Sequence, residues 1–209
     1  MLDYVVFFSS CFFDTEPFRT LEEGGSRETL QFWECEERMV VVGASGQWNR
    51  DLHEEACTAD KVPVVQRLSG GGAVIVGRGC LSYSMVLSLE AKPELRSVAH
   101  SYTLILGRIV ERLGLPSLAV RGMSDITIGD RKISGNAQRR GRRALLHHGT
   151  ILYDFDVRCM ERYLKEPQRQ PAYRAGRSHS DFVTNAPLER DAIKDGITRA
   201  WNDLKGDLS

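Results

Sequence analysis

The sequence predicts an α+β domain with a mixed β-sheet and flanking helices. Many short apolar runs of strand length occur along the chain, and two long segments show helical periodicity. Strands and helices do not alternate regularly, so a parallel sheet built from repeated βαβ units is not indicated. With 42% apolar residues among 209, the chain can bury one core, and we expect a single domain over residues 1–209.

The strand candidates are runs of β-branched and aromatic residues bounded by turn residues. The run LSYSMVLSL is the clearest, because apolar residues alternate with small polar ones, as in a half-buried strand. The N-terminal run YVVFFSSCFF follows an aspartate and no lysine or arginine, so a buried strand fits it better than a signal peptide. The predicted strands are 4–9, 28–34, 39–43, 63–68, 73–77, 81–89, 118–121, 124–129 and 144–154.

The helix candidates carry apolar residues at helical spacing. Gly114 and Pro116 end the first long helix, and Pro187 stands at the start of the second. The predicted helices are 96–114, 188–205, 157–164 and a segment near 50–58.

Charge and cysteine content limit the classes of function. Lysine plus arginine equals aspartate plus glutamate, 28 each, so a generally basic nucleic-acid-binding protein is not indicated. No apolar run approaches the roughly 20 residues of a membrane span. The five cysteines are scattered without a C-x-x-C pair, which is typical of reduced thiols and not of a disulfide framework or zinc site. We therefore expect a cytoplasmic protein without a nucleic-acid or membrane partner.

A run of three glycines, Gly70 to Gly72, interrupts the β-forming stretch QRLSGGGAVIV. Glycine weakens a strand, so such a run marks a bulge or the close approach of a ligand or another backbone. A flexible turn would also explain these glycines when they are taken alone.

A second informative stretch spans residues 124–154, SDITIGDRKISGNAQRRGRRALLHHGTILYD. GDRK is a plausible tight turn, and Lys132 stands beside it. Each piece has an ordinary structural explanation. A lysine after a turn is usually solvated, and paired histidines on a strand are commonly one core and one surface residue. The run RRGRR is most simply an exposed loop, with a phosphate or acidic-partner contact as the alternative.

Together, the two stretches resemble the lipoate-protein ligase A family, part of the wider biotin/lipoate ligase group. The first family pattern is an arginine two residues before SGGGAV, and this chain has RLSGGGAV at 67–74. The second is K-x-x-G-x-A with a later histidine–glycine strand, and this chain has KISGNA at 132–137 and HHGT at 147–150. Both patterns occur in the family's order, and the resemblance covers residues from about 29 to 156.

The resemblance implies a class II synthetase-like fold and a ligase activity. Family members activate lipoate or octanoate with ATP and transfer the acyl group from the acyl-adenylate to a lysine of a carrier domain. It implies ATP and Mg²⁺ as cofactors. The implied partners are lipoyl-carrier domains, either the E2 component of a 2-oxoacid dehydrogenase or the glycine cleavage H protein.

By the same resemblance, Lys132 is catalytic and contacts both the carboxyl oxygen and the α-phosphate. A compact ammonium suits charge that moves between two oxygens, and the planar fork of Arg67 suits a phosphate. Asp125 is the candidate Mg²⁺ ligand, and His148 would orient the substrate or support the fold. The implied ligand-binding residues are Arg67, Gly70, Gly71, Gly72, Ala73, Val74, Ile75, Gly135, Ala137, His148 and Gly149.

The chain departs from the family pattern in several places. Val76 and Gly77 stand where a His–Asp pair is common, and Gln66 replaces the first of two arginines. The N-terminal helix pattern of the family is not visible in the first 18 residues. The segment after residue 185 can hold one helix, so we expect no separate C-terminal accessory domain in this chain. Adenylation is then expected to be weak or to require a separate chain.

Two alternatives stay open at the level of sequence. The first is an ATP-independent octanoyl or lipoyl transferase between carrier proteins. Its thiol-dependent form is disfavoured, because the loop SLAVRGMSD before the lysine motif lacks the cysteine that this branch uses. The second is a non-catalytic domain that binds lipoyl carriers or the free acid.

Overall fold

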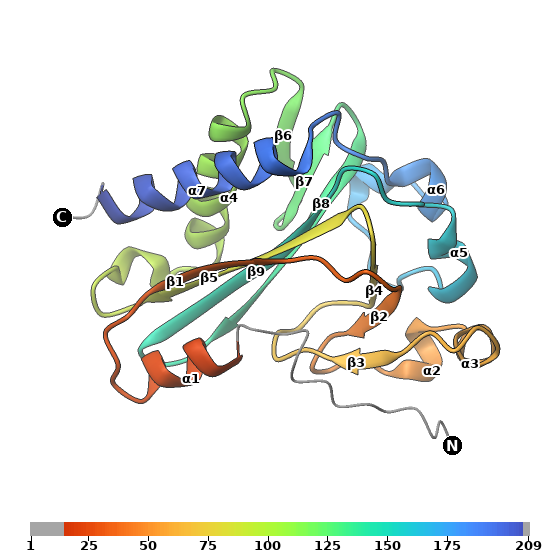
Figure 1. The fold of residues 1–209 in the computed structure, drawn as a ribbon, viewed down its shortest axis with the longest axis horizontal. Helices are drawn as coiled ribbons and strands as arrows, with labels where there is room; N and C mark the ends of the chain where they lie inside the picture. Colours follow the sequence, from red (N-terminus) through yellow and green to blue (C-terminus); the bar gives the residue numbers. More distant parts are fainter. Residues whose placement is uncertain (1–14, 207–209) are drawn as a thin grey trace.

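Two β-sheets form the framework of the computed structural model, which describes residues 15–206 (Figure 1). The large sheet is antiparallel, and the small sheet pairs β2 in parallel with β3 and antiparallel with β4. The predicted α+β class is confirmed, with parallel pairing confined to the small sheet. In spatial order the strands are β1 (Thr29–Trp33), β5 (Cys80–Ser88), β9 (Ala144–Leu152), β8 (Arg131–Arg140), β7 (Asp125–Ile128) and β6 (Leu118–Arg121), then β3 (Val64–Gln66), β2 (Met39–Val42) and β4 (Val74–Val76).

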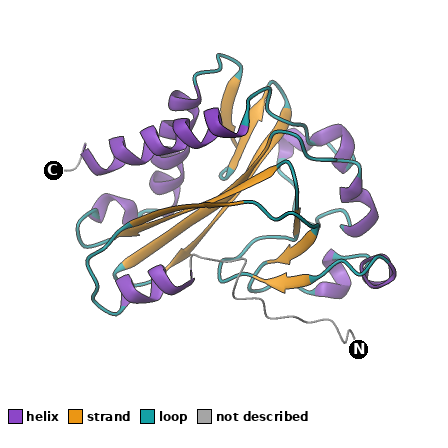
Figure 2. Ribbon diagram, viewed as in Figure 1, coloured by secondary structure: helices purple, strands orange, loops and turns teal. Residues whose placement is uncertain are grey.

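Two long helices cover one face of the large sheet, α4 (Val98–Leu113) and α7 (Arg190–Gly206) (Figures 1 and 2). Ser97 caps α4 by accepting a hydrogen bond from the His100 amide, and Gly114 ends it with φ of 70°. The apolar stripes of both helices pack on alternate residues of β5 and β9, among them Tyr83 and Leu145. This is the main core of the molecule.

Away from the α4/α7 face lie the small sheet and most of the shorter helices, whereas η2 packs against α4 and contributes Leu95 to the main core. Helix α1 packs on β5 and β9 through Phe18 and Leu21, which cluster with Val86 and Leu146. A further core joins the valines of β2 to the helices at the other end of the sheet. The shorter helical elements are α1 (Thr15–Glu22), α2 (Trp48–Asp51), α3 (Glu54–Ala59), η2 (Pro93–Arg96), α5 (Cys159–Tyr163), η3 (Ala172–Arg174) and α6 (His179–Phe182).

The long predicted helices and most predicted strands agree with the structure. The sequence patterns do not predict β8, α1, α6 or the short 3-10 helices η2 and η3, and the helix predicted near residues 50–58 is two short helices, α2 and α3. The strand predicted at 4–9 lies outside the described residues. None of the helices within residues 15–206 combines the length and the apolar character that crossing a membrane requires.

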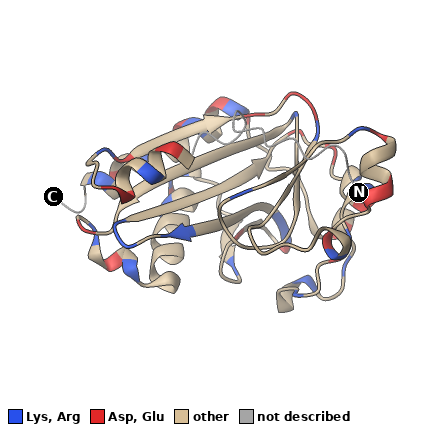
Figure 3. Ribbon diagram, turned by 90° about the horizontal axis from the view of Figure 1, so that it is seen from below, with Lys and Arg blue, Asp and Glu red and all other residues tan. Residues whose placement is uncertain are grey.

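The RRGRR run is half strand and half turn. Arg139 and Arg140 belong to β8, and the turn that follows is held by the carboxylate of Glu22 in α1. This carboxylate accepts hydrogen bonds from three successive backbone amides, those of residues 142, 143 and 144, at 2.8–2.9 Å. Burial acts to raise the pKa of Glu22, but these bonds and the nearby Arg142 outweigh it and lower the pKa. The turn therefore has a structural explanation. Over the described part of the molecule, acidic and basic residues are interspersed (Figure 3).

Candidate active site

A cavity of about 400 Å³ brings the two sequence motifs together. Its walls come from the glycine segment before β4, from β7, β8 and β9, and from the chain between residues 160 and 183. Gly70 is the one predicted ligand-binding residue that does not line it. The predicted residues that do are Arg67, Gly71, Gly72, Ala73, Val74, Ile75, Asp125, Lys132, Gly135, Ala137, His148 and Gly149.

A β-bulge on β8 directs Lys132 into this cavity. Ser134 pairs with Ile126 and Lys132 pairs with Thr127, so Ile133 is an extra residue without a partner on β7. On a regular strand, residues three apart face opposite sides, but the extra residue places Lys132 on the same face as Gly135. Ile133 is instead fully buried in the helix-side core. The bulge thus places two adjacent residues in different surroundings, with Ile133 in the core and Lys132 at the cavity.

The Lys132 ammonium is held by a carboxylate. Its Nζ lies 2.7 Å from Oδ1 of Asp125, and the other oxygen of Asp125 accepts a hydrogen bond of 2.7 Å from the Tyr173 hydroxyl. Burial, followed by this hydrogen bond, raises the pKa of Tyr173, so the hydroxyl stays a donor. A Cβ at Gly135 would lie 2.9 Å from Nζ, so the glycine leaves the space that the lysine side chain occupies.

Arg67 is buried behind the glycine segment and holds it in place. Its Nε donates to Ser69 Oγ at 3.0 Å, and its Nη2 donates to the carbonyls of Gly70 and Gly72 at 2.7 and 2.9 Å. Nη1 donates to the carbonyl of Val41 on β2 at 3.2 Å. Burial lowers the pKa of Arg67 to about 10, which leaves it charged at neutral pH. The phosphate contact expected of Arg67 stays a prediction, and in the structure its guanidinium holds the glycine segment.

The three glycines differ in what they require. Gly71 has φ of 96°, which side chains rarely adopt, and a Cβ there would lie 2.9 Å from Arg67 Nη2. Its carbonyl oxygen would be 2.1 Å from a Cβ on Gly43, so two backbones meet closely here. A Cβ on Gly72 would meet no atom within 4 Å, and because this residue lines the cavity, a side chain would enter the ligand space.

The paired histidines of β9 face opposite sides of the sheet. His148 lines the cavity, and its Nε2 lies 2.5 Å from Ser69 Oγ. His147 is fully buried on the helix side, within hydrogen-bond range of Gln138 and Tyr83. Burial, with His148 nearby, lowers the pKa of His147 to about 3, so it is neutral at physiological pH. The pair is therefore one core histidine and one cavity histidine, where the ordinary structural explanation expects one core and one surface residue.

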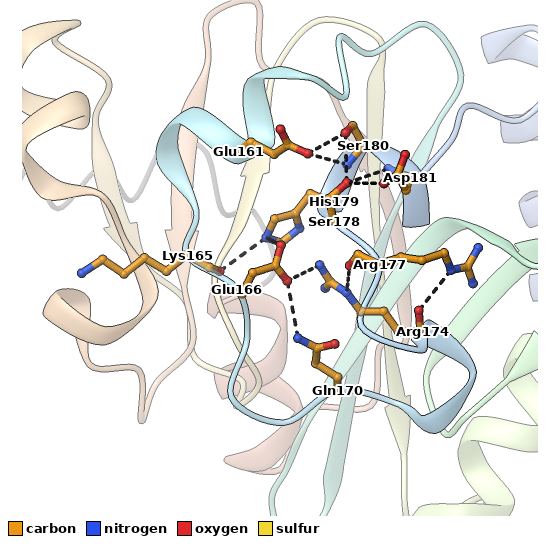
Figure 4. A network of polar contacts seen from close by, with 10 residues as sticks. All are labelled: Glu161, Lys165, Glu166, Gln170, Arg174, Arg177, Ser178, His179, Ser180 and Asp181. Carbon is orange, nitrogen blue, oxygen red and sulfur yellow. Dashed lines mark hydrogen bonds and ion pairs between the residues drawn. The ribbon is translucent and has the colours of Figure 1, made fainter.

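Sequence reasoning missed the third wall of the cavity, which comes from residues 167–183. Within it, Arg174 is buried and donates to Glu166 at 2.5 Å and to the carbonyl of Arg177 at 2.9 Å (Figure 4). Its guanidinium also lies over the Phe182 ring. His179 also lines the cavity, and its pKa is lowered by burial and then by Arg174. The arginine- and proline-rich composition of this segment was the available signal.

The cavity lining is cationic overall. Four lining residues carry positive charge, and Asp125 is the only carboxylate among the lining residues of the described chain. Apolar side chains form much of the remaining surface. A site with this balance suits a ligand with an anionic group and an apolar part. The four cations are Arg67, Lys132, Arg169 and Arg174.

The residues around Asp125 do not form a magnesium site by themselves. Both oxygens of Asp125 are engaged, one by the Lys132 ammonium and one by the Tyr173 hydroxyl. Within residues 15–206, no group of three or more His, Cys, Asp or Glu side chains could hold a metal ion. Mg²⁺ is commonly bound by one or two carboxylates together with substrate phosphates, and here a lysine already neutralises the single carboxylate. In this arrangement Asp125 is engaged by Lys132 and Tyr173, and its role as the Mg²⁺ ligand stays a prediction.

Two of the four described cysteines, Cys80 and Cys159, give little support to thiol catalysis, while Cys35 is only partly buried and lines the cavity. Cys80 and Cys159 are buried, and burial raises the pKa of Cys80 to about 12 and that of Cys159 to about 11. Both are therefore thiols and poor nucleophiles at neutral pH.

With this geometry in place, comparison with known proteins identifies the family. The family model of the lipoyl protein ligase A/B catalytic domain matches residues 9–191. The chain belongs to this family. Two relatives named "Probable lipoate-protein ligase A" come from Mycoplasma pneumoniae and Mycoplasma genitalium. The first is 29% identical over 143 residues, which cover 68% of this chain and 41% of the relative; the second is 27% identical over 158 residues, 76% and 46%. The chain thus spans under half the length of these family members.

Solved structures show the lipoate ligase fold. The bi-partite lipoate protein ligase of Thermoplasma acidophilum, studied with its E2 lipoyl domain, has a TM-score of 0.72, covering 86% of this chain and 71% of that one. A lipoate-protein ligase A bound with ATP has a TM-score of 0.71, covering 89% and 75%. LipL1 of P. falciparum in complex with lipoate has 0.67, covering 88% and 51%. Each is 20% identical to this chain, so the likeness establishes the fold, and the chemistry rests on the site.

Proposed function

We propose that the protein is a lipoate-protein ligase that uses ATP to activate lipoate or octanoate and transfers the acyl group to a carrier-domain lysine. The observation that carries the proposal is a single cavity that is lined by Lys132, by the bare glycine segment at Gly71 and Gly72, and by apolar side chains. The family membership, and the ATP and lipoate bound by proteins of the same fold, support it.

In the first step, a carboxylate oxygen of the acid attacks the α-phosphorus of ATP. A new P–O bond forms, the bond to the bridging oxygen breaks, and pyrophosphate leaves with that electron pair. Both reactants are anionic, so fixed positive charge must offset their repulsion. Lys132 supplies it by exchanging its bond to Asp125 for bonds to the reacting oxygens. Tyr173 then keeps Asp125 in place as the ammonium turns.

In the second step, the neutral amine of a carrier lysine attacks the acyl carbon. The amide bond forms, AMP leaves with the electrons of the anhydride bond, and the nitrogen loses a proton to solvent. We assign the backbone amides around Gly72, which line the cavity, as donors to the acyl or phosphate oxygens. The mixed anhydride is hydrolysable, so apolar walls that exclude water protect it.

The acyl tail is assigned to the apolar part of the cavity. Val41, Ile75, Leu152, Met160 and Phe182 contribute to this lining. At about 0.8 kcal/mol per buried CH₂, a seven-methylene tail gains roughly 5–6 kcal/mol before losses. This is the chemical reason to propose a medium-chain acid.

The test is acylation of an apo lipoyl domain of an E2 component, and of an apo H protein, followed by intact mass. The protein is incubated with the carrier, lipoate or octanoate, and ATP with Mg²⁺. A mass increase that requires ATP supports the ligase. An increase from an octanoyl-carrier thioester without ATP would instead identify a transferase. Binding of the acid without acylation would identify a non-catalytic domain.

The Lys132→Ala variant assigns the chemistry to the site. We expect acylation to be lost while the protein stays folded, with a lowered melting temperature because the buried Asp125 loses its counter-charge and keeps only the Tyr173 hydrogen bond. Unchanged acylation in this variant would remove Lys132 from the mechanism.

A further inference from the structure

Three of the four cavity cations are already engaged within the protein. Arg67 is bound to the glycine segment, Lys132 to Asp125, and Arg174 to Glu166. Arg169 differs from them. Among residues 15–206 it has no hydrogen bond, ion pair or ring contact, yet it lines the cavity and is exposed. An arginine that meets no acceptor in the protein is available to a ligand.

The backbone that carries Arg169 is held on both sides. Pro167 and Pro171 flank it, and each fixes its own φ. Gln168 accepts a hydrogen bond from Arg50 of α2, and the side chain of Gln170 contacts Glu166 at 3.4 Å (Figure 4). The segment thus positions its one unengaged cation at the cavity before any ligand binds.

Exposure places Arg169 at the solvent side of the cavity. Lys132 lies deeper, against Gly135 and the buried Asp125, where the carboxylate and the α-phosphate are proposed to meet. The β- and γ-phosphates must extend from that point, and pyrophosphate must leave to solvent. A guanidinium presents a planar fork that binds two phosphate oxygens at once.

We propose that Arg169 binds the β- and γ-phosphates of ATP. The assignment rests on the proposed function. The two arginines then have separate roles, because Arg67 shapes the glycine segment while Arg169 meets the triphosphate and then the leaving pyrophosphate.

The test compares ATP and AMP binding by calorimetry in wild type, Arg169→Ala and Arg169→Lys. AMP lacks the phosphates that Arg169 is assigned to bind, so it serves as the internal control. We expect Arg169→Ala to weaken ATP binding about tenfold, the lower range for a hydrogen bond to a charged group, and AMP binding by less than about twofold. Arg169→Lys should keep part of the affinity, because its single ammonium retains the charge without the fork.

The matched control is Arg158→Ala. This arginine is 87% exposed, lies outside the cavity and pairs with Asp156. It should leave both affinities unchanged, and all variants should melt within a few degrees of wild type because both arginines are exposed.

Three results would overturn the assignment. They are unchanged ATP affinity in Arg169→Ala, equal losses for ATP and AMP, and a rise confined to the KM for the carrier, which would make Arg169 a docking residue. A wild-type protein that binds no ATP would overturn the proposed function itself, and this is seen before any variant is compared.

Discussion

Gly135 offers the sharpest test of how the site is built, because its role is to leave space. A Cβ at this position would lie 2.9 Å from Lys132 Nζ and 3.0 Å from its Cε. Ordinary contacts begin near 3.4 Å, so Gly135→Ala must move the ammonium by about 0.5 Å or more. The lysine would have to leave its 2.7 Å contact with Asp125 or swing away from the glycine segment.

We expect Gly135→Ala to lower the catalytic activity and to leave the folding stability nearly unchanged. Misplacing a reacting group by about 1 Å costs on the order of 100-fold, so we expect kcat/KM to fall about 10- to 100-fold. The displaced atoms are the end of a flexible side chain, and a partly exposed ion pair contributes about 0–1 kcal/mol. The melting temperature should therefore change by no more than about 4 °C for a chain of this length.

The assay is ATP-dependent carrier acylation measured beside thermal unfolding. Gly107→Ala is the control, since a Cβ there meets no atom within 4 Å and the residue lies inside α4. It should leave activity intact and raise stability by up to about 1 kcal/mol. Full activity in Gly135→Ala, with activity lost in Lys132→Ala, would refute the reasoning, as would unfolding of Gly135→Ala.

Three further outcomes follow from groups described above. Arg67→Lys should lower the free energy of unfolding by about 2–3 kcal/mol, because a lysine cannot reach all the acceptors that Arg67 serves. Urea unfolding measures this change. Full stability combined with lost ATP binding would show instead that Arg67 binds phosphate. Glu22→Gln should be less stable than wild type at neutral pH. The pKa of Glu22 in the folded protein lies below its ordinary value of 4.5. The extra stability of wild type over Glu22→Gln is therefore present above pH 4.5 and is lost as the pH falls through the folded pKa. A difference in unfolding free energy between the two proteins that stays constant in urea titrations from about pH 7 to 3 would contradict this. Cys80 and Cys159, with pKa values raised to about 12 and about 11, should resist iodoacetamide in the folded protein near pH 8 and react after denaturation, and Cys80→Ser should retain acylation; fast native labelling at Cys80 would reopen the thiol transferase.

Sequence patterns predicted most of the framework because its elements carry strong periodicity. β5 alternates apolar and polar residues, and α4 carries a clear stripe with glycine at its end. β8 was missed because its residues, RKISGNAQRR, lack apolar alternation, and neighbouring strands on both sides define it. Helix α1 has only Phe18 and Leu21 as buried residues, too few for a periodic signal. In both cases tertiary pairing outweighs local preference.

The sequence predicted which residues line the cavity, but it did not predict most of the bonds that these residues make with one another. Lys132 and Gly72 line one cavity, as the resemblance implied. The bond of Arg67 to the Val41 carbonyl spans 26 positions, and no local pattern encodes it. Asp125 engages Lys132 because a hairpin brings β7 beside β8, and the identity of the two residues alone does not predict this ion pair.

The unpartnered Ile133 explains the spacing between Lys132 and Gly135 in the sequence motif. Two residues on the same face of a regular strand are an even number of positions apart, but these two are three positions apart. In this chain, the odd interval in the sequence therefore corresponds to the β-bulge at Ile133. A chain shortened by Ile133 would have an even interval and would still direct the lysine into the cavity. The damage would appear instead as a void between the sheet and its two long helices.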